Sequence, residues 1–154
     1  MNGRLLHLEG DALVEDLADT AIGGVDGLAF LDGVLYVNNV QTGDLYRIEM
    51  ADGAVSGYTT LTLDRALEGP DGMRTAADGS GLYVAENAAG RVSKITIDGD
   101  SGSVETVGQG NWISATAIAE VGGQLYVIDT QFPSMGAEGA ADIPFNAMAV
   151  AGGM

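Results

Sequence analysis

Short apolar runs alternate with polar residues along most of the chain, and turn residues separate the runs every few positions. Residues 44–50 and 91–97 alternate in this way, and residues 4–8 and 12–17 near the start are further short strand candidates. A period of two indicates strands with one buried face, and Asp-Gly pairs between such runs are typical of tight hairpin turns. The pattern therefore predicts an all-β chain built from hairpins.

Three stretches repeat this pattern, and they cover residues 25–39, 70–86 and 114–129. The first two open with Asp-Gly pairs at Asp26 and Asp71, 45 residues apart, and all three end in L-Y-V with a polar residue two positions later. A period of about 40–50 residues in a strand-rich chain is typical of a β-propeller, in which each repeat forms one blade. The recurring tyrosine of L-Y-V is best explained by core packing.

The repeats predict a single partial propeller domain over residues 1–154, with about three four-stranded blades. We expect full blades over residues 24–63 and 70–108, with residues 55–63 as the outer strand of the first. An incomplete blade follows over residues 113–150, and residues 1–18 form the outer two strands of another. We expect residues 144–150 to supply a third strand to the last blade.

Propellers close with about four to eight blades, so about three blades amount to half of a six-bladed ring. Three arrangements remain open at this point. Two copies of the chain close the ring as a homodimer, the chain is a fragment of a longer propeller, or the blades form an open stack. The open stack leaves sheet faces and edges uncovered, which favours aggregation.

Composition narrows the classes of function. The chain has no cysteine, which excludes disulfides and thiolate metal sites. Its net charge of −16 repels nucleic acid and anionic membranes, so neither is an expected partner. The first ten residues carry no signal-peptide core, which favours a cytoplasmic protein over a secreted one, although secretion within a longer parent protein stays open. The acidic residues have two interpretations that can hold together. They form a solvated acidic surface, or some of their carboxylates converge on a divalent cation.

One segment carries a family resemblance. Residues 68–107 read E-G-P-D-G-M-R-T-A-A-D-G-S-G-L-Y-V-A-E-N-A-A-G-R-V-S-K-I-T-I-D-G-D-S-G-S-V-E-T-V. In P-D-G-M, L-Y-V-A and G-R-V, taken in this order, the segment resembles the senescence marker protein/gluconolactonase family, also known through regucalcin. Pro144 and Phe145 with the apolar residues 147–150 also look like the closing strand of that family. The resemblance extends over about residues 24–150 and corresponds to the family's C-terminal half.

The resemblance implies a six-bladed propeller that holds a divalent metal in its central channel, as calcium, zinc or magnesium, and hydrolyses lactones or small esters. The family's ligand Asp in P-D-G-M corresponds to Asp71. Its ligand Asn in N-G-L corresponds to Asp26, and a carboxylate in place of an amide still suits a hard cation. The family's first-blade Glu ligand and its substrate-binding Arg and Asn have no matching positions in this chain. In a dimer, both copies of Asp26 and Asp71 would surround one channel.

In this chemistry Asp71 is also the candidate catalytic residue, because a channel carboxylate orients or deprotonates a metal-bound water. The alternative is that Asp71 and Asp26 only cap turns by bonding their own backbone. The candidate substrate-binding residues are Glu68, Ser114 and Trp112. The alternative is that Glu68 is only a surface residue of its loop and that Ser114 and Trp112 only pack in the core.

Other polar residues are weaker candidates. Polar residues cluster after L-Y-V in the three units: Asn38, Asn39, Glu86, Asn87 and Asp129. Glu86 is an alternative candidate for the base. Ordinary turn chemistry explains the cluster better. His7 is the only histidine and has no nucleophile nearby, which argues against a catalytic triad.

The sequence thus predicts a metal-dependent hydrolase of lactones or small esters, active as a closed dimer. The competing hypotheses are a non-catalytic propeller module that binds a partner or small ligand, and an inactive fragment of a longer propeller.

Overall fold

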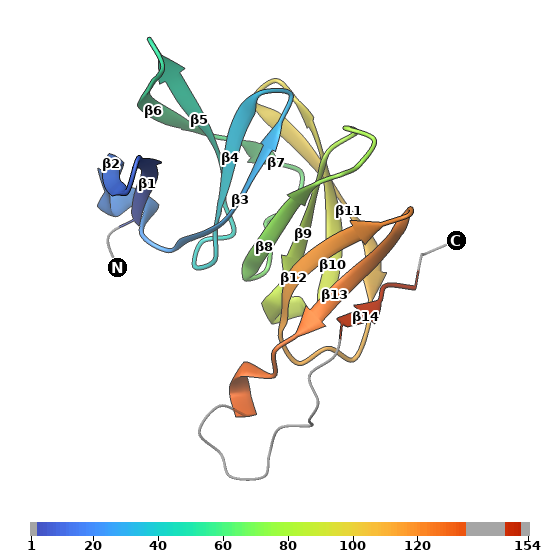
Figure 1. Ribbon diagram of the computed structural model, residues 1–154. Coiled ribbons are helices and arrows are strands. Elements are labelled where there is room, and N and C mark those ends of the chain that lie inside the picture. Colours follow the sequence, from blue (N-terminus) through green and yellow to red (C-terminus); the bar gives the residue numbers. More distant parts are fainter. Residues whose placement is uncertain (1–2, 135–146, 152–154) are drawn as a thin grey trace.

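A computed structural model describes residues 3–134 and 147–151. The described residues form four sheets that lie one after another along the chain, joined by loops and three short 3-10 helices (Figure 1). A two-stranded hairpin lies at one end of this row and a three-stranded sheet lies at the other (Figure 1). In the part of the chain that is described, no helix is long and apolar enough to cross a membrane.

The first sheet is the hairpin of β1 (Gly3–Glu9) and β2 (Ala12–Asp19), followed by the 3-10 helix η1 (Thr20–Ile22). The second sheet contains, in order, β3 (Val25–Leu31), β4 (Val34–Asn39), β5 (Leu45–Ala51) and β6 (Ala54–Thr60). Two of its hairpins turn at Asp-Gly pairs in which both residues have positive φ, 51° at Asp32 and 79° at Gly33 in the first. This backbone matches the twist of the flanking strands, which explains why Asp-Gly marks these turns in the sequence.

The third sheet has five strands in the order β7-β11-β10-β9-β8. Its members are β7 (Thr62–Leu63), β8 (Pro70–Thr75), β9 (Leu82–Glu86), β10 (Arg91–Asp98) and β11 (Ser101–Gln109), with the 3-10 helix η2 (Asn87–Ala89) after β9. The fourth sheet contains β12 (Ala115–Val121), β13 (Gln124–Asp129) and β14 (Ala147–Ala149), with the 3-10 helix η3 (Phe132–Ser134) after β13. Thus β14 forms the expected third strand, while Pro144 and Phe145 lie outside the described residues.

The prediction of one outer strand over residues 55–63 is wrong. The strand ends at Thr60, and the chain then changes sheets, because β7 pairs in parallel with β11 of the third sheet. At the crossing, the Leu61 N–H donates to the Leu45 carbonyl at 2.9 Å, and the Leu61 side chain is buried. The Thr62 N–H then donates to the Asp100 carbonyl at 2.8 Å. One buried leucine therefore ties the second sheet to the third.

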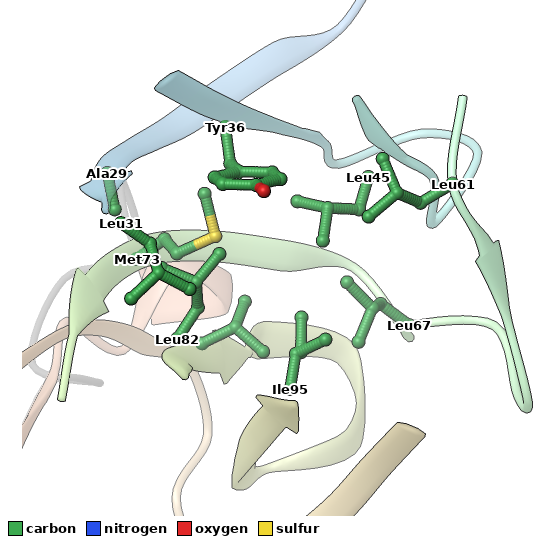
Figure 2. Close-up of a cluster of buried hydrophobic side chains, with 10 residues drawn as sticks. Ala29, Leu31, Tyr36, Leu45, Leu61, Leu67, Met73, Leu82 and Ile95 are labelled. Carbon is green, nitrogen blue, oxygen red and sulfur yellow. The ribbon is translucent and has the colours of Figure 1, made fainter. Parts of the chain in front are cut away.

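The largest described core cluster lies between the second and third sheets (Figure 2). Side chains from both sheets meet there, and they include Tyr36, Leu45, Met73, Leu82 and Ile95. A second cluster, which includes Val92 and Val127, joins the third and fourth sheets. Each sheet is therefore held to the next by apolar side chains, and the row of sheets is one packed unit.

The innermost strands β3, β8 and β12 approach one another through their backbones. Each contains a register shift, at residues 25–28, 70–73 and 115–117 respectively, which marks a β-bulge. A Cβ on Gly27 would lie 2.2 Å from the Asp71 carbonyl oxygen, and a Cβ on Gly72 would lie 2.5 Å from the Thr116 carbonyl oxygen. The glycines that follow Asp26 and Asp71 thus allow neighbouring bulges to touch.

Candidate functional site

Asp26 and Asp71 lie at equivalent bulges on the adjacent strands β3 and β8. The sequence placed Asp71 just before the innermost strand, whereas it lies inside β8. Asp26 is exposed and Asp71 is half-buried. The two carboxylates are near enough for the charge of one to affect the titration of the other. The bulges therefore bring both predicted ligand residues to one place.

Burial raises the pKa of the Asp71 carboxyl, and the neighbouring Asp26 carboxylate raises it further. Hydrogen bonds from the Gly72 N–H and from the Asn87 amide oppose this increase, and the Asn87 Nδ2 lies 3.4 Å from Asp71 Oδ2. A carboxylate with a raised pKa is a better proton acceptor than an ordinary one.

Asn38 holds the backbone of this site in position. Its side chain is fully buried and spans the two bulges. The Gly27 N–H donates to Asn38 Oδ1 at 2.9 Å, and Asn38 Nδ2 donates to the Asp71 carbonyl oxygen at 2.6 Å. The sequence grouped Asn38 with turn residues and gave no sign of this link to Asp71, 33 positions further along the chain.

A hollow of about 250 Å³ runs along the three bulged strands. Asp26 lines it together with residues of β8 and β12, including Gly72, Arg74 and Ala117. Arg74 is exposed and lines the same hollow as Asp26. Sequence reasoning missed this residue, although it stands only three positions after Asp71. The hollow thus offers the Asp26 carboxylate and the Arg74 side chain to a small polar ligand, whereas Asp71 is not among the residues that line it.

The groups at the paired bulges that could bind a cation all offer oxygen atoms. Asp26, Asp71 and the Asn87 amide are the groups that could take part in holding a cation. Among the described residues, no cluster of three or more His, Cys, Asp or Glu side chains is placed to hold a metal ion. Two carboxylates with water ligands suit magnesium or calcium, whereas zinc prefers nitrogen and sulfur ligands in a closed tetrahedron.

The three candidate substrate-binding residues make other contacts. Glu68 is exposed, and its carboxylate pairs with Arg91 at 2.8 Å. Ser114 is buried, and its N–H donates to Asp129 Oδ1 at 2.8 Å. Trp112 packs against the cluster that joins the third and fourth sheets. None of the three lines the hollow beside Asp26.

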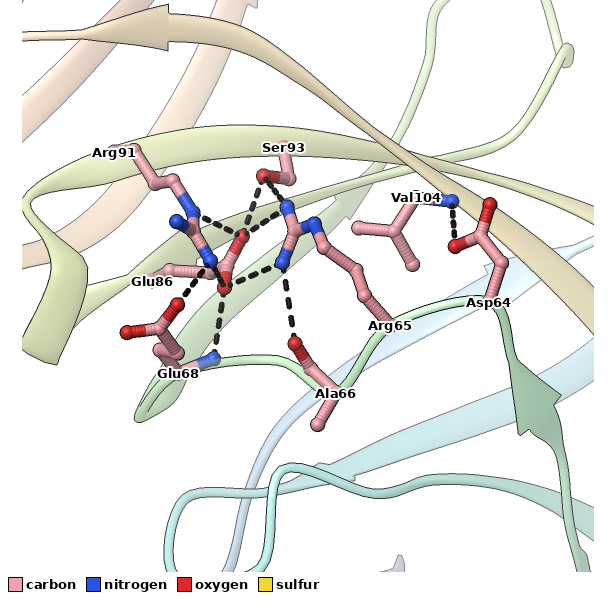
Figure 3. A network of polar contacts seen from close by, with 8 residues as sticks. All are labelled: Asp64, Arg65, Ala66, Glu68, Glu86, Arg91, Ser93 and Val104. Carbon is pink, nitrogen blue, oxygen red and sulfur yellow. Dashed lines mark hydrogen bonds and ion pairs between the residues drawn. The ribbon is translucent and has the colours of Figure 1, made fainter.

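Glu86 forms the densest polar network among the described residues (Figure 3). Its buried carboxylate accepts hydrogen bonds from Arg65 at 2.8 and 3.0 Å, from Arg91 at 2.7 and 2.9 Å, and from the Ser93 hydroxyl. The Glu68 N–H also donates to it, at 2.7 Å. Burial alone would raise the pKa of Glu86, but these hydrogen bonds lower it to about 2. A fully bonded carboxylate of such low basicity is unsuited to act as a general base.

The position of Glu86 recurs in the other sheets. Asn39, Glu86 and Asp129 each end the second strand of their sheet, and each is buried. Each side chain bonds the backbone of the loop that enters the innermost strand of the same sheet: Asn39 to the Gly23 carbonyl, Glu86 to the Glu68 N–H, and Asp129 to the Ile113 and Ser114 N–H groups. The polar residue after L-Y-V therefore fixes a loop, in agreement with the turn chemistry that the sequence favoured.

His7 lies on the β1–β2 hairpin, away from the bulged strands. Its Nδ1 lies 2.8 and 2.9 Å from the two carboxylate oxygens of Asp16 across the hairpin.

Comparison with solved structures identifies the fold. A luciferin-regenerating enzyme matches 97% of this chain with a TM-score of 0.67 and 21% identity, and the match covers 50% of that protein. Regucalcin from Agrobacterium tumefaciens, a calcium-binding protein, matches 80% of this chain with a TM-score of 0.61 and 21% identity, over 43% of its length. A chain of a nidogen/laminin complex matches 80% of this chain at the same TM-score and identity, over 48% of its length.

The chain is a partial β-propeller. The predicted all-β fold class is confirmed, and the four sheets are its complete and incomplete blades. The chain spans about half the length of the solved structures that it matches. No protein-family model matches the chain, and a comparison with curated proteins finds no match. Because the sequence identities to these solved structures are low, the likeness shows the fold alone. One fold can host many unrelated functions.

Proposed function

We propose that this partial propeller is a metal-dependent hydrolase of lactones or small esters. The observation that carries the proposal is the pair of carboxylates, Asp26 and Asp71, on adjacent bulges, with Asp26 lining the hollow. The raised pKa of Asp71 adds to it, because perturbed carboxyls in clefts are typical of functional sites. The fold likeness to regucalcin, described as a calcium-binding protein, is consistent with a divalent ion at this place.

Asp26 and Asp71 would hold the ion, and the all-oxygen donor set favours calcium or magnesium over zinc. A divalent ion bound there would supply Lewis acidity, which polarises an ester carbonyl and lowers the pKa of a bound water. Asp71 would orient the attacking water or accept its proton, as a carboxylate placed beside the ion can do. Asn87 would orient the Asp71 carboxylate, and Arg74 would bind oxygen atoms of the substrate at the rim.

A lactone and ester hydrolysis assay in calcium, magnesium, zinc or chelator tests the proposal. We expect activity that chelator abolishes, and a loss of at least about 100-fold in kcat for Asp71→Asn. The matched control is Asp98→Asn, which makes the same charge change at an exposed position on β10 and should leave kcat unchanged. Hydrolysis that survives both chelator and Asp71→Asn would overturn the proposal.

A second candidate function is binding of a macromolecular partner without catalysis. The observation in its favour is the match to a chain of a nidogen/laminin complex, at the same TM-score as the match to regucalcin. In this case chelator and Asp71→Asn would leave partner binding unchanged. A protein that neither hydrolyses any ester nor binds an ion would favour this candidate or an inactive part of a longer propeller.

A further inference from the structure

The two ends of the row of sheets expose apolar side chains. At the first end, the face of the second sheet beside the hairpin exposes Leu28, Phe30 and Met50, at 48, 61 and 57%. At the other end, the fourth sheet exposes Val121 and Ile128, at 64 and 42%. Between these ends, apolar side chains join each sheet to the next. Contiguous apolar patches on a protein surface mark places where another surface docks.

The first end also contains a cavity beside an open strand edge. The cavity has a volume of about 400 Å³ and lies between β1 of the hairpin and the second sheet. Leu5 and Leu6 line it from β1, and Leu28, Phe30 and Leu35 line it from the second sheet. In the described residues β1 pairs only with β2, so its other edge is free to bind a strand. An open edge above an apolar floor is the arrangement that accepts an added strand.

The other end of the same chain offers a matching strand. Within the described residues β14 pairs only with β13, so the fourth sheet has three strands and an open edge. The two sheets between the ends contain four strands (the second) and five strands (the third). A three-stranded sheet joined to a two-stranded hairpin would contain five strands, as the third sheet does. The two ends of the chain are thus complementary in strand number, in open edges and in apolar character.

We propose that a second copy of this chain occupies the cavity, with its β14 beside β1 and its exposed β12–β13 face against Phe30 and Leu28. The reciprocal contact at the other end gives a two-fold dimer with two identical interfaces and a closed ring. Each new interface repeats the sheet-to-sheet packing that already joins β3 to β8 and β8 to β12. Because the chain spans about half the length of the propellers it matches, two copies supply the length of one of them.

The closed ring would surround one channel with the bulged inner strands of both copies. Asp26 and Asp71 of each copy lie on these strands, so the channel would contain two acidic pairs. The dimer rests on the packing of the two ends and does not depend on the proposed hydrolase activity. The mass measurement tests the dimer and the activity assay tests the hydrolase. Either prediction can therefore fail while the other holds, so the two proposals are distinguishable.

Light scattering and sedimentation equilibrium of the full chain test the dimer. We expect twice the mass of one chain, and Phe30→Lys or Val121→Lys should each raise the dissociation constant at least about tenfold. Both side chains are exposed in the single chain, so each variant should keep the circular dichroism spectrum of the original protein. The matched control is Thr106→Lys, an exposed position on β11, which should leave the dissociation constant unchanged.

Three results would overturn the proposal. A monomer at every concentration would mean that the ends stay open or are covered by other protein. A dimer that tolerates both lysine substitutions would use a different surface. Polymers that lengthen with concentration would mean that the ends join without closing a ring.

Discussion

Two carboxylates of this chain show how strongly surroundings set the properties of one chemical group. Glu86 is buried, yet two arginines and a serine keep its pKa at about 2. Asp71 is only half-buried, and burial together with Asp26 raises its pKa. The sequence offered both as candidate proton acceptors, because it does not show which arginines reach which acid. Arg91, and then Arg65 from 21 positions before Glu86, lower the Glu86 pKa most. Among the described residues, no arginine lowers the pKa of Asp71 in this way.

We expect Glu86→Gln to lower the free energy of unfolding by about 3 kcal/mol, because it leaves two partly buried arginines without their carboxylate. Urea unfolding at pH 7 measures the loss. Glu105→Gln makes the same change at an exposed position and should cost less than about 0.5 kcal/mol. An equally small loss for Glu86→Gln would contradict the structural role of the network.

The comparison of the original protein with Glu86→Gln also predicts a pH dependence of stability with a defined sign. The pKa of Glu86 falls from 4.5 to about 2 on folding, so its stabilisation is complete above pH 4.5 and is lost as the pH falls toward 2. The stability difference between the original protein and Glu86→Gln should therefore shrink over that range. Urea unfolding at a series of pH values measures it, and a difference that stays constant down to pH 2 would show that the carboxylate charge is irrelevant.

Asp26→Asn should have opposite effects on the free protein and on ion binding. Removal of the Asp26 charge lets the pKa of Asp71 fall toward its ordinary value, which relieves repulsion at neutral pH. We expect the metal-free variant to be as stable as the original protein or more stable, by less than about 1 kcal/mol. Calcium or magnesium should raise the Tm of the original protein but not of the variant. A rise of equal size in both would place the ion elsewhere.

At the scale of the elements, the sequence predicted most strands because alternation and Asp-Gly turns are local signals. The hairpin of β12 and β13 lies where residues 115–129 indicated it. The strand β7 was missed because its partner β11 comes from the next repeat. The local alternation of apolar and polar residues does not indicate that the chain changes sheets at this point. The Asp-Gly pairs of β3 and β8 were noticed as possible ligand positions, whereas the reason for their glycines became visible only when neighbouring bulges were seen to touch.

These contacts make Gly27 sensitive to the addition of one methyl group. A Cβ at this position would lie 2.2 Å from the backbone oxygen of Asp71, so Gly27→Ala should separate β3 from β8 and lower the free energy of unfolding by about 2–3 kcal/mol. Gly57→Ala is the matched control, because its nearest neighbour would be the Glu49 side chain at an ordinary 3.5 Å. Thermal and urea unfolding compare the two, and equal stability would mean that the bulges do not pack in this way.

At the scale of the whole molecule, the repeat period predicted a propeller and about three blades, because the length of one blade appears in the sequence as the repeat period. It left three arrangements open, because closure depends on surfaces far apart in the sequence. The proposed closed dimer rests on exposed Phe30 of the second sheet and exposed Val121 of the fourth. Neither residue stood out in the sequence, where both belong to ordinary alternating strands.

The net charge of −16 gives the dimer a predictable response to salt. Two copies repel each other at low ionic strength, while the proposed interfaces are apolar, so added salt should screen the repulsion and strengthen the apolar contacts. We expect the dissociation constant to fall by at least about tenfold between 20 mM and 500 mM sodium chloride, since the Debye length shortens to a few ångströms over that range. Sedimentation equilibrium at several salt concentrations measures this change. A dimer that salt dissociates would instead be held by ion pairs, and the apolar ends would not be its interface.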